Sequence, residues 1–372
     1  MSNGVSVHDR DACDEGYTLF AESYEHPEES PDGTGKIYLV DMEGEPVHRW
    51  KVETALQSHC RLLPNGNLLY PTRDRSDIER AGLRELDPDS EIVWSYHCRI
   101  DHDYQVLEGK NTNGVPQEDG RMLLHTIRDS LSPEIGPELK RNPYIVEIDR
   151  DKNLHWEWDG ADHYDDLREH LSDEEWEYVD RRIESEFPFD WAHNNTLEVI
   201  PENETAEIER ERGGPVRFEP GNIVFSYRSI DVIGVIDYPS GDIVWAWGPS
   251  ELDGQHLPHV LENGNLLIFD NGAERGYSRV IELDPLEDEI VWEYTGSPKS
   301  SFYSPFISGA RRLPNGNTLI CEGSERRLFE VTPDGEIVWD FVSPFGETGS
   351  LGTVYRCQRY SPAYVEPLLE SI

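Results

Sequence analysis

The sequence has little positive charge and very little lysine. Lysine and arginine total 33 of the 372 residues, against 75 aspartates and glutamates, so the formal net charge is −42 and the pI is near 4.5. Such a charge repels phosphate backbones and anionic lipid surfaces, so we expect no nucleic-acid partner and no membrane partner. Because concentrated salt screens the self-repulsion of an acidic surface, this composition predicts a halophilic protein.

Long apolar segments and paired cysteine motifs are also missing. No stretch reaches the roughly 18 apolar residues of a membrane span, and residues 1–30 hold no basic segment followed by an apolar run, so we expect neither a signal nor an anchor and predict a cytoplasmic protein. The cysteines form no C-x-x-C pair and are odd in number, which argues against a disulfide framework or a zinc-finger site. They are Cys13, Cys60, Cys98, Cys321 and Cys357.

A short turn motif recurs along the chain. It is clearest as Leu-x-Asn-Gly-Asn and begins at Leu63, Leu261 and Leu313, with related turns at 118–121 and 220–222. Asn-Gly tolerates the positive φ of a tight turn between two strands. About 20 or more residues after each turn, a second turn leads into an apolar run that contains a tryptophan. The chain is therefore built from repeated units.

Six tryptophans mark these units in register, at Trp50, Trp94, Trp156, Trp245, Trp292 and Trp339. Their shortest spacings, 44 to 47 residues, are typical of a four-stranded propeller blade. We predict an all-β protein, a six-bladed β-propeller that forms one domain over residues 1–372. Two stacked β-sandwiches would not explain the constant tryptophan register. A longer spacing holds a predicted helical insertion at about 163–187.

The ends of the chain are predicted to complete the first blade. Its unit has three strands, at 17–21, 37–41 and 46–52, and lacks the strand that precedes the Asn-Gly turn elsewhere. The alternating segment 352–360 can supply this strand, and such closure removes free sheet edges.

The blade order predicts which residues lie together. If the Asn-Gly turns lie on one face, the starts of the first strands and the ends of the second strands lie on the other. The strand starts hold His59, His102, His193 with Asn194, and His256; the strand ends hold Arg73, Arg128 and Arg228, with Arg275 and Arg279 following in the fifth blade. Because arginine can donate two hydrogen bonds to one oxyanion, we predict a substrate-binding anion site here.

Other interpretations remain open for these residues. Any one of the histidines, or an arginine beside an aspartate, can be purely structural. A ring of histidines can also hold zinc, but these lie about 40 to 90 residues apart rather than in a local ligand motif, so we expect no metal site. A propeller could also bind an anionic ligand or a protein partner at this face without chemistry.

The sequence resembles the arylsulfotransferase (aryl-sulfate sulfotransferase) family over nearly its whole length. The resemblance rests on Asp-Trp-Ala-His-Asn-Asn at 190–195, Gly-Asn-Ile-Val-Phe-Ser-Tyr-Arg at 221–228, Val-Trp-Ala-Trp-Gly at 244–248, Gln-His at 255–256, the segment 263–272 that ends in Asp-Asn-Gly, and the closing segment 355–360. The family consists of six-bladed propellers that move a sulfuryl group between phenols without a nucleotide cofactor.

The resemblance implies roles for individual residues. His193, His256 and Arg275 are expected to be catalytic, and Arg275, with Arg279 as the substitute, is expected to bind the sulfate. The expected partners are an aryl sulfate and a phenol, and no cofactor is expected. The sequence departs from the family at 302–309, where the histidine that becomes sulfated is expected and no histidine occurs. The nucleophile is then His256 or His193, or the protein is a non-catalytic propeller.

Overall fold

The chain divides into two compact units, and each is described by itself. The computed structural model describes residues 4–23, 35–52, 55–73, 80–107, 109–110, 120–345 and 352–370. We call Met1–Ile100 with Phe302–Ile372 the terminal unit and Asp101–Ser301 the central unit. The predicted single domain over residues 1–372 stays a prediction.

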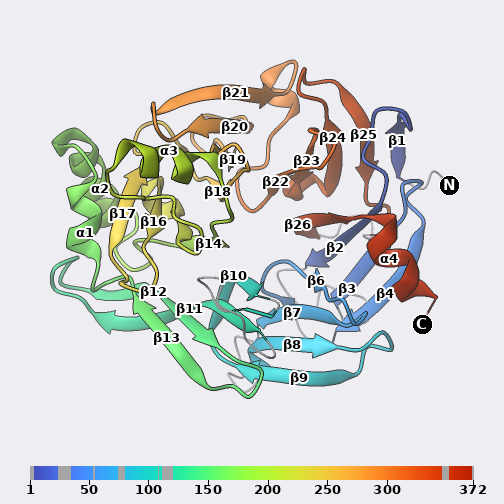
Figure 1. Cartoon of the computed structure of the whole chain (residues 1–372), viewed down its shortest axis with the longest axis horizontal. Coiled ribbons are helices and arrows are strands. Elements are labelled where there is room, and N and C mark those ends of the chain that lie inside the picture. Colours follow the sequence, from blue (N-terminus) through green and yellow to red (C-terminus); the bar gives the residue numbers. More distant parts are fainter. Residues whose placement is uncertain are drawn as a thin grey trace. The chain divides into compact units, whose positions relative to one another are not determined.

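The described strands form six antiparallel sheets, one per predicted unit, and the fold is the predicted six-bladed β-propeller (Figure 1). In the terminal unit, the first blade is β26 (Thr353–Tyr360), β2 (Tyr17–Ser23), β3 (Gly35–Val40) and β4 (Pro46–Val52). The second blade is β5 (Ala55–Leu56) and β6 (Arg61–Leu62), β7 (Leu68–Arg73), β8 (Gly82–Leu86) and β9 (Ile92–His97). The sixth is β22 (Gly309–Arg312), β23 (Thr318–Glu322), β24 (Arg327–Val331), β25 (Ile337–Val342) and β1 (Val5–His8).

The central unit carries the other three blades. The third blade is β10 (Ile100–Leu107), β11 (Arg121–Leu131), β12 (Leu139–Ile148) and β13 (Leu154–Asp159). The fourth is β14 (Asn194–Val199), β15 (Ile223–Tyr227), β16 (Val232–Ile236) and β17 (Ile243–Trp247). The fifth is β18 (His256–Val260), β19 (Leu266–Asp270), β20 (Arg279–Asp284) and β21 (Glu289–Thr295).

The turn motif and the tryptophans have the structure that the sequence predicts. In the turn at Leu261, Gly264 has φ +82° and donates to the Leu261 carbonyl, and Leu261 donates back to the carbonyl of Asn265. The turns at Leu63 and Leu313 repeat both bonds. Each of the six tryptophans lies in the fourth strand of its blade.

The C-terminal segment completes the first blade, as predicted. Strand β26 pairs antiparallel with β2, from Tyr17 opposite Tyr360 to Ser23 opposite Thr353. The Tyr360 hydroxyl also accepts a hydrogen bond from the Leu62 amide at 2.9 Å. Helix α4 (Pro362–Leu369) follows β26. The first and last parts of the chain thus share one sheet.

The insertion of the central unit is helical, as predicted, and packs against the blades. It forms α1 (Tyr164–Glu169) and α2 (Asp173–Ser185), and α2 begins with a capping box between Ser172 and Glu175. The apolar face of α2 joins the same buried cluster as Trp191. In the described residues, no helix is long and apolar enough to span a membrane.

Among the described strands and α-helices, three are absent from the sequence-based expectations. They are β1, which pairs with β25 as a fifth strand of the sixth blade, α3 (Glu204–Arg212) and α4.

Candidate active site

In the fourth and fifth blades, strand starts lie beside strand ends; in the third blade, by contrast, Arg128 lies within β11, three residues before the strand ends at Leu131. In the fourth blade, Asn194 at the start of β14 pairs with Tyr227 at the end of β15, and the Arg228 amide donates to the His193 carbonyl at 3.4 Å. In the fifth blade, His256 opens β18 and pairs with Phe269, near the end of β19. Antiparallel pairing therefore places the predicted histidines beside the residues that follow each second strand.

The rings of His102 and His193 meet edge to face, with centroids 4.6 Å apart. Each ring is held by a carboxylate: His102 Nδ1 lies 2.6 Å from Asp101 Oδ2, and His193 Nδ1 lies 2.7 Å from Asp190 Oδ2. An ionised carboxylate only accepts, so Nδ1 donates and the neutral ring keeps its lone pair on Nε2. This tautomer is the one that a base or a nucleophile acting through Nε2 needs.

The Asp101 carboxylate interacts electrostatically with three histidines, His102, His125 and His193. Burial opposes its charge, but the neighbouring His102, His125 and His193 outweigh burial and hold the pKa of Asp101 well below its ordinary value. His125 is fully buried, and burial lowers its pKa; its Nδ1 lies 2.7 Å from the Asp101 carbonyl. Within the described residues, His125 Nε2 has no hydrogen-bond partner.

One cluster in this region has the composition of a cation site. Asp101, His102 and His125 each offer a ligand atom, and these atoms lie within 4.8 Å of one another. Carboxylate and imidazole ligands suit zinc and related divalent ions. These three residues could therefore hold a divalent cation next to His193.

His256 is almost fully buried and is held by an amide rather than by a carboxylate. Its Nδ1 lies 2.7 Å from Asn271 Oδ1 and 3.1 Å from the Gly254 carbonyl. The fourth blade fixes the backbone on both sides of His256, because Asn195 donates to the Gln255 carbonyl and the Leu257 amide donates to Thr196 Oγ1. The ring position is thus set by two blades.

Arg228 is half-buried and lies close to the segment that leads into His256. A methyl group added at Gly254 would lie 3.8 Å from both Nε and Nη2 of Arg228. The Gly254 amide donates to Asp231 Oδ1 at 2.6 Å, which fixes this segment against the loop that carries Arg228. The Arg228 guanidinium therefore lies against the segment that joins the fourth and fifth blades. It lies near Gly254, which is two residues before His256 in the sequence.

Helix α2 supports this loop through Asp231. The Tyr178 hydroxyl donates to Asp231 Oδ2 at 2.5 Å, and Arg182 lies 3.5 Å from the same oxygen and donates through Nε to the Ser229 carbonyl. Burial raises the pKa of Asp231 to about 6, although Arg182 and Tyr178 oppose this shift. The helical insertion thus positions the backbone around Arg228.

Arg275 and Arg279 share one buried carboxylate, Asp270. Arg275 Nη2 lies 3.1 Å and Arg279 Nε 2.8 Å from Asp270 Oδ2. Burial raises the pKa of Asp270, and the two arginines oppose this shift. Arg275 also lies against Gly272, next to the Asn271 that holds His256. Arg279 also pairs with Glu293 at 3.1 Å, so the Arg275 guanidinium is the cation of this group that lies next to the segment holding His256.

The remaining predicted residues have other surroundings. Asn194 is buried; its Oδ1 accepts from the Ser226 amide, and its Nδ2 has no hydrogen-bond partner within the described residues. Arg128 is half-exposed, pairs with Asp159 and lies over the Tyr144 ring. His59 and Arg73 belong to the terminal unit, where His59 is half-buried between β5 and β6 and Arg73 ends β7, with a side chain outside the described residues.

The stretch at 302–309, where the resemblance implies a histidine, holds a buried serine pair. Ser308 is fully buried with φ +85°, donates to Ser304 Oγ at 2.8 Å and accepts from the Gly323 amide at 3.0 Å. The hydroxyl of Ser308 thus helps to fix the loop.

Sequence reasoning missed the residues that orient the histidines. These are Asp190, Asn271 and Asp101. Asp190 and Asn271 were part of the motifs that carry the resemblance, and a carboxylate three residues before His193 was a readable signal. The contact of Asn271 with His256 follows only from the register of β18 and β19.

Comparisons with known proteins agree with the fold and the motifs. A family model described as Arylsulfotransferase (ASST) matches residues 113–344. No curated protein matches the chain significantly. The chain is similar in structure to a protein of unknown function from Bacteroides caccae, with a TM-score of 0.54 and 13% identity over 93% of this chain and 99% of that one.

Two further solved structures are similar at lower scores. One is the Cps50 (Swd1) β-propeller domain of Myceliophteria thermophila, with a TM-score of 0.46 and 9% identity over 92% of this chain and 91% of that one. The other is the periplasmic gluconolactonase of Pseudomonas aeruginosa, with a TM-score of 0.46 and 12% identity over 93% and 99%.

Proposed function

Because the chain belongs to the arylsulfotransferase (ASST) family, we propose that it transfers a sulfuryl group from an aryl sulfate to a phenol at the histidine and arginine site of the central unit, without a cofactor. One observation supports this site above others: the side chains of Arg228 and Arg275 lie against Gly254 and Gly272, next to the groups that hold His256 Nδ1, and the neighbouring blade carries His193 with its Nδ1 held by Asp190. In a chain with a net charge of −42, such a group of cations and imidazoles favours an anion.

The different partners of the two histidines suggest different roles. His256 is held by the neutral Asn271 amide, so its ring can act as a nucleophile through Nε2. His193 is held by the Asp190 carboxylate, which stabilises the positive charge that the ring acquires when it takes a proton. We therefore assign His256 as the nucleophile and His193 as the acid and base, with His102 supporting His193 through the ring contact.

The first half-reaction forms a sulfohistidine. The Nε2 lone pair of His256 attacks the sulfur, an N–S bond forms, and the S–O bond to the aryl group breaks. The electron pair leaves with the aryl oxygen, which takes a proton from the protonated His193 ring. Arg228 and Arg275 hold the sulfuryl oxygens as the charge on them shifts in the transition state.

The second half-reaction returns the enzyme to its starting state. The oxygen of the acceptor phenol attacks the sulfur while His193 Nε2 takes the phenolic proton. The N–S bond breaks, and its electron pair returns to His256. The products are a new aryl sulfate and the free histidine, so no atom or electron is gained or lost.

A second candidate function is binding without turnover. It is favoured by one observation, the absence of a histidine from 302–309. In this case the site would bind an aryl sulfate through the same arginines and release it unchanged.

The test is an assay with 4-nitrophenyl sulfate as donor and phenol as acceptor, in concentrated salt. Transfer releases 4-nitrophenolate and forms phenyl sulfate, and His256→Ala should abolish both products. His163→Ala is the matched control, because His163 is also held by an aspartate but lies in the helical insertion. Binding of the donor with no product from the wild-type protein would support the second candidate, and neither binding nor product would contradict both.

A further inference from the structure

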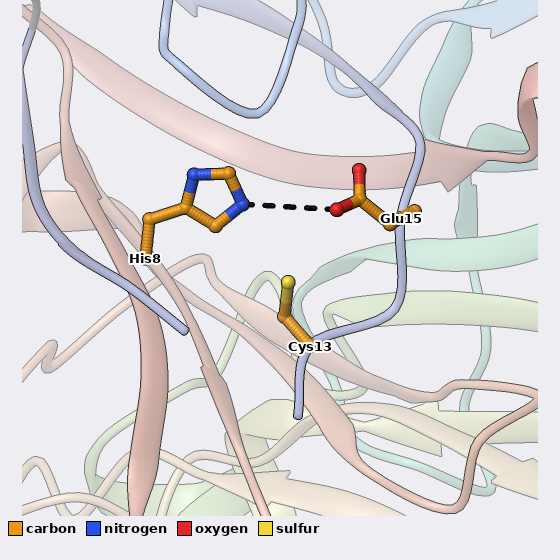
Figure 2. Close-up of side chains that lie close together, drawn as sticks. All are labelled: His8, Cys13 and Glu15. Carbon is orange, nitrogen blue, oxygen red and sulfur yellow. Dashed lines mark ion pairs between the residues drawn. The ribbon is translucent and has the colours of Figure 1, made fainter. Parts of the chain in front are cut away.

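A second group of metal-ligating side chains lies in the terminal unit, in the loop between β1 and β2. His8 is the last residue of β1, and Cys13 and Glu15 follow shortly before β2 begins at Tyr17. Figure 2 shows the His8 ring and the Glu15 carboxylate facing each other, with the Cys13 sulfur directed toward the space between them. This group is separate from the proposed active site, which belongs to the central unit.

The distances in this group suit a bound ion better than direct bonding between the side chains. One ligand atom from each of the three residues lies within 4.8 Å of the others. His8 Nε2 and Glu15 Oε1 are 4.0 Å apart, which is too far for a hydrogen bond. Two ligands at about 2.1 Å from a tetrahedral zinc ion lie roughly 3.4 Å apart. A small inward shift of the exposed Glu15 side chain would therefore complete this part of the geometry.

The surroundings of the group favour a cation. The Cys13 thiol is buried and lies near the carboxylates of Glu330 and Glu15. Glu43 lies 3.8 Å from His8 Nδ1 on the other side of the ring. His8 Nε2 is a buried atom without a hydrogen-bond partner within the described residues. Glu43 also pairs with Arg10 and Glu330 with Arg359, so a divalent ion would give this nitrogen a partner and would offset chiefly the charge of Glu15.

The loop is fixed before any ion binds. The Asp9 amide donates to the Val338 carbonyl at 2.8 Å, and the Cys13 amide donates to the Asp9 carbonyl at 2.9 Å. The Asp14 amide donates to Glu330 Oε1 at 2.8 Å. These bonds anchor both ends of the loop on the sixth blade, so little chain entropy remains to be lost when the three ligands converge on an ion.

We propose that His8, Cys13 and Glu15 form a site for a divalent transition metal ion of the zinc type, with the fourth position open to water. The mixture of imidazole, thiolate and carboxylate suits such an ion rather than calcium or magnesium, which prefer ligand sets made of oxygen alone. Binding displaces the thiol proton of Cys13 into the solvent and forms a metal–sulfur bond.

The ion would act as a cross-link. Strand β1 belongs to the sixth blade and β2 to the first blade, and the two blades lie in the same unit. A metal held by His8 at the end of β1 and by Glu15 just before β2 would tie the N-terminal strand to the loop that joins these blades. The ion would therefore stabilise the terminal unit without taking part in catalysis.

Cobalt is the probe, because a thiolate–Co²⁺ bond absorbs in the near ultraviolet and reports on cysteine ligation alone. The full-length protein is stripped with a chelator and titrated with Co²⁺. We expect a charge-transfer band whose final intensity corresponds to one thiolate–Co²⁺ bond per chain, and Zn²⁺ should remove it and raise the melting temperature. The histidine and aspartate cluster of the central unit contains no cysteine, so it cannot produce this band.

Two variants and one control assign the ligands. Cys13→Ser should abolish the band, and Glu15→Gln, at an exposed side chain, should weaken Co²⁺ binding about 10-fold or more. Cys98→Ser is the control, because Cys98 is a half-buried free cysteine in another blade and its loss should leave the band unchanged. The absence of a band in the wild-type protein, or its persistence in Cys13→Ser, would overturn the proposal.

Discussion

The imidazole rings of His102 and His193 meet edge to face although they come from different blades, and each ring is held at Nδ1 by its own aspartate. Both residues have positive φ, 56° at His102 and 46° at His193, in a region that residues other than glycine seldom adopt. Turn residues such as Ser90 and Lys152 share this conformation, but at His102 and His193 it coincides with a ring contact and a carboxylate partner. The contact therefore marks the part of the central unit where chemistry is expected.

The Asp190 carboxylate is predicted to position His193 as the base. Asp190→Asn keeps the size of the side chain but removes the charge that stabilises the protonated ring. We expect kcat for sulfuryl transfer to fall about 10²-fold or more with little change in KM, and the pH profile of kcat to shift. Steady-state kinetics with 4-nitrophenyl sulfate at several pH values measures both effects.

The helical insertion supplies a matched control for this variant. His163 Nδ1 lies 2.7 Å from Asp166, also three residues away in sequence, so Asp166→Asn removes an equivalent pair outside the site. Equal losses of kcat in the two variants would contradict a positioning role for Asp190.

The arginines are predicted to hold the sulfuryl oxygens. Removing one charge-assisted contact costs about 1.5 to 3 kcal/mol, so Arg228→Ala should weaken the binding of 4-nitrophenyl sulfate roughly 10- to 100-fold. Arg228→Ala with Arg275→Ala should weaken it further. Titration calorimetry measures the affinity, with Arg210→Ala as control, because Arg210 lies on α3 and pairs with Glu219. An unchanged affinity in the double variant would contradict an anion site here.

Much of the fold could be predicted because its signals are local. The Asn-Gly turns set the hairpins, and tryptophans such as Trp50 and Trp339 recur at the same position of the fourth strand. Strand β1 gave no such signal. It is four residues long and only partly buried, and it pairs with β25 at the opposite end of the sequence. Pairing over that separation is set by the whole fold and not by a local pattern.

The site could be predicted less completely than the fold. The strand positions of His193 and His256 follow from the repeat, but the groups that orient them depend on side-chain packing. Arg275 shows this limit. The resemblance predicts that Arg275 binds sulfate. The structure shows that Arg275 also forms an ion pair with Asp270, which it shares with Arg279. Whether two arginines share one carboxylate depends on how three side chains of one blade pack together. No sequence pattern indicates this arrangement.

Asp231 is predicted to make stability depend on pH. Its pKa is about 6 in the folded protein and near 3.8 when unfolded, so between these values the folded state binds more protons. The contribution of protonated Asp231 to the stability of the folded state is therefore fully present below pH 3.8. This contribution is lost as the pH rises through about 6. The difference in unfolding free energy between wild type and Asp231→Asn should change by about 2 kcal/mol from pH 4 to pH 7, with the wild type losing stability relative to the variant.

Denaturant unfolding of both proteins at pH 4, 5, 6 and 7 measures this difference. The other titrating groups are the same in both proteins, so their contributions cancel in the difference in unfolding free energy. A difference that does not vary with pH would show that Asp231 is already charged at low pH, and that Arg182 and Tyr178 outweigh its burial.

The account as a whole depends on a covalent intermediate at His256. The direct measurement is to mix the protein with aryl sulfate labelled at sulfur, without an acceptor, quench within one turnover under alkaline conditions, and map the label by peptide sequencing. We predict label on His256 in the wild type and none in His256→Ala, with release when phenol is added before the quench. Turnover without label on any histidine, or label on a residue outside the central unit, would contradict the account.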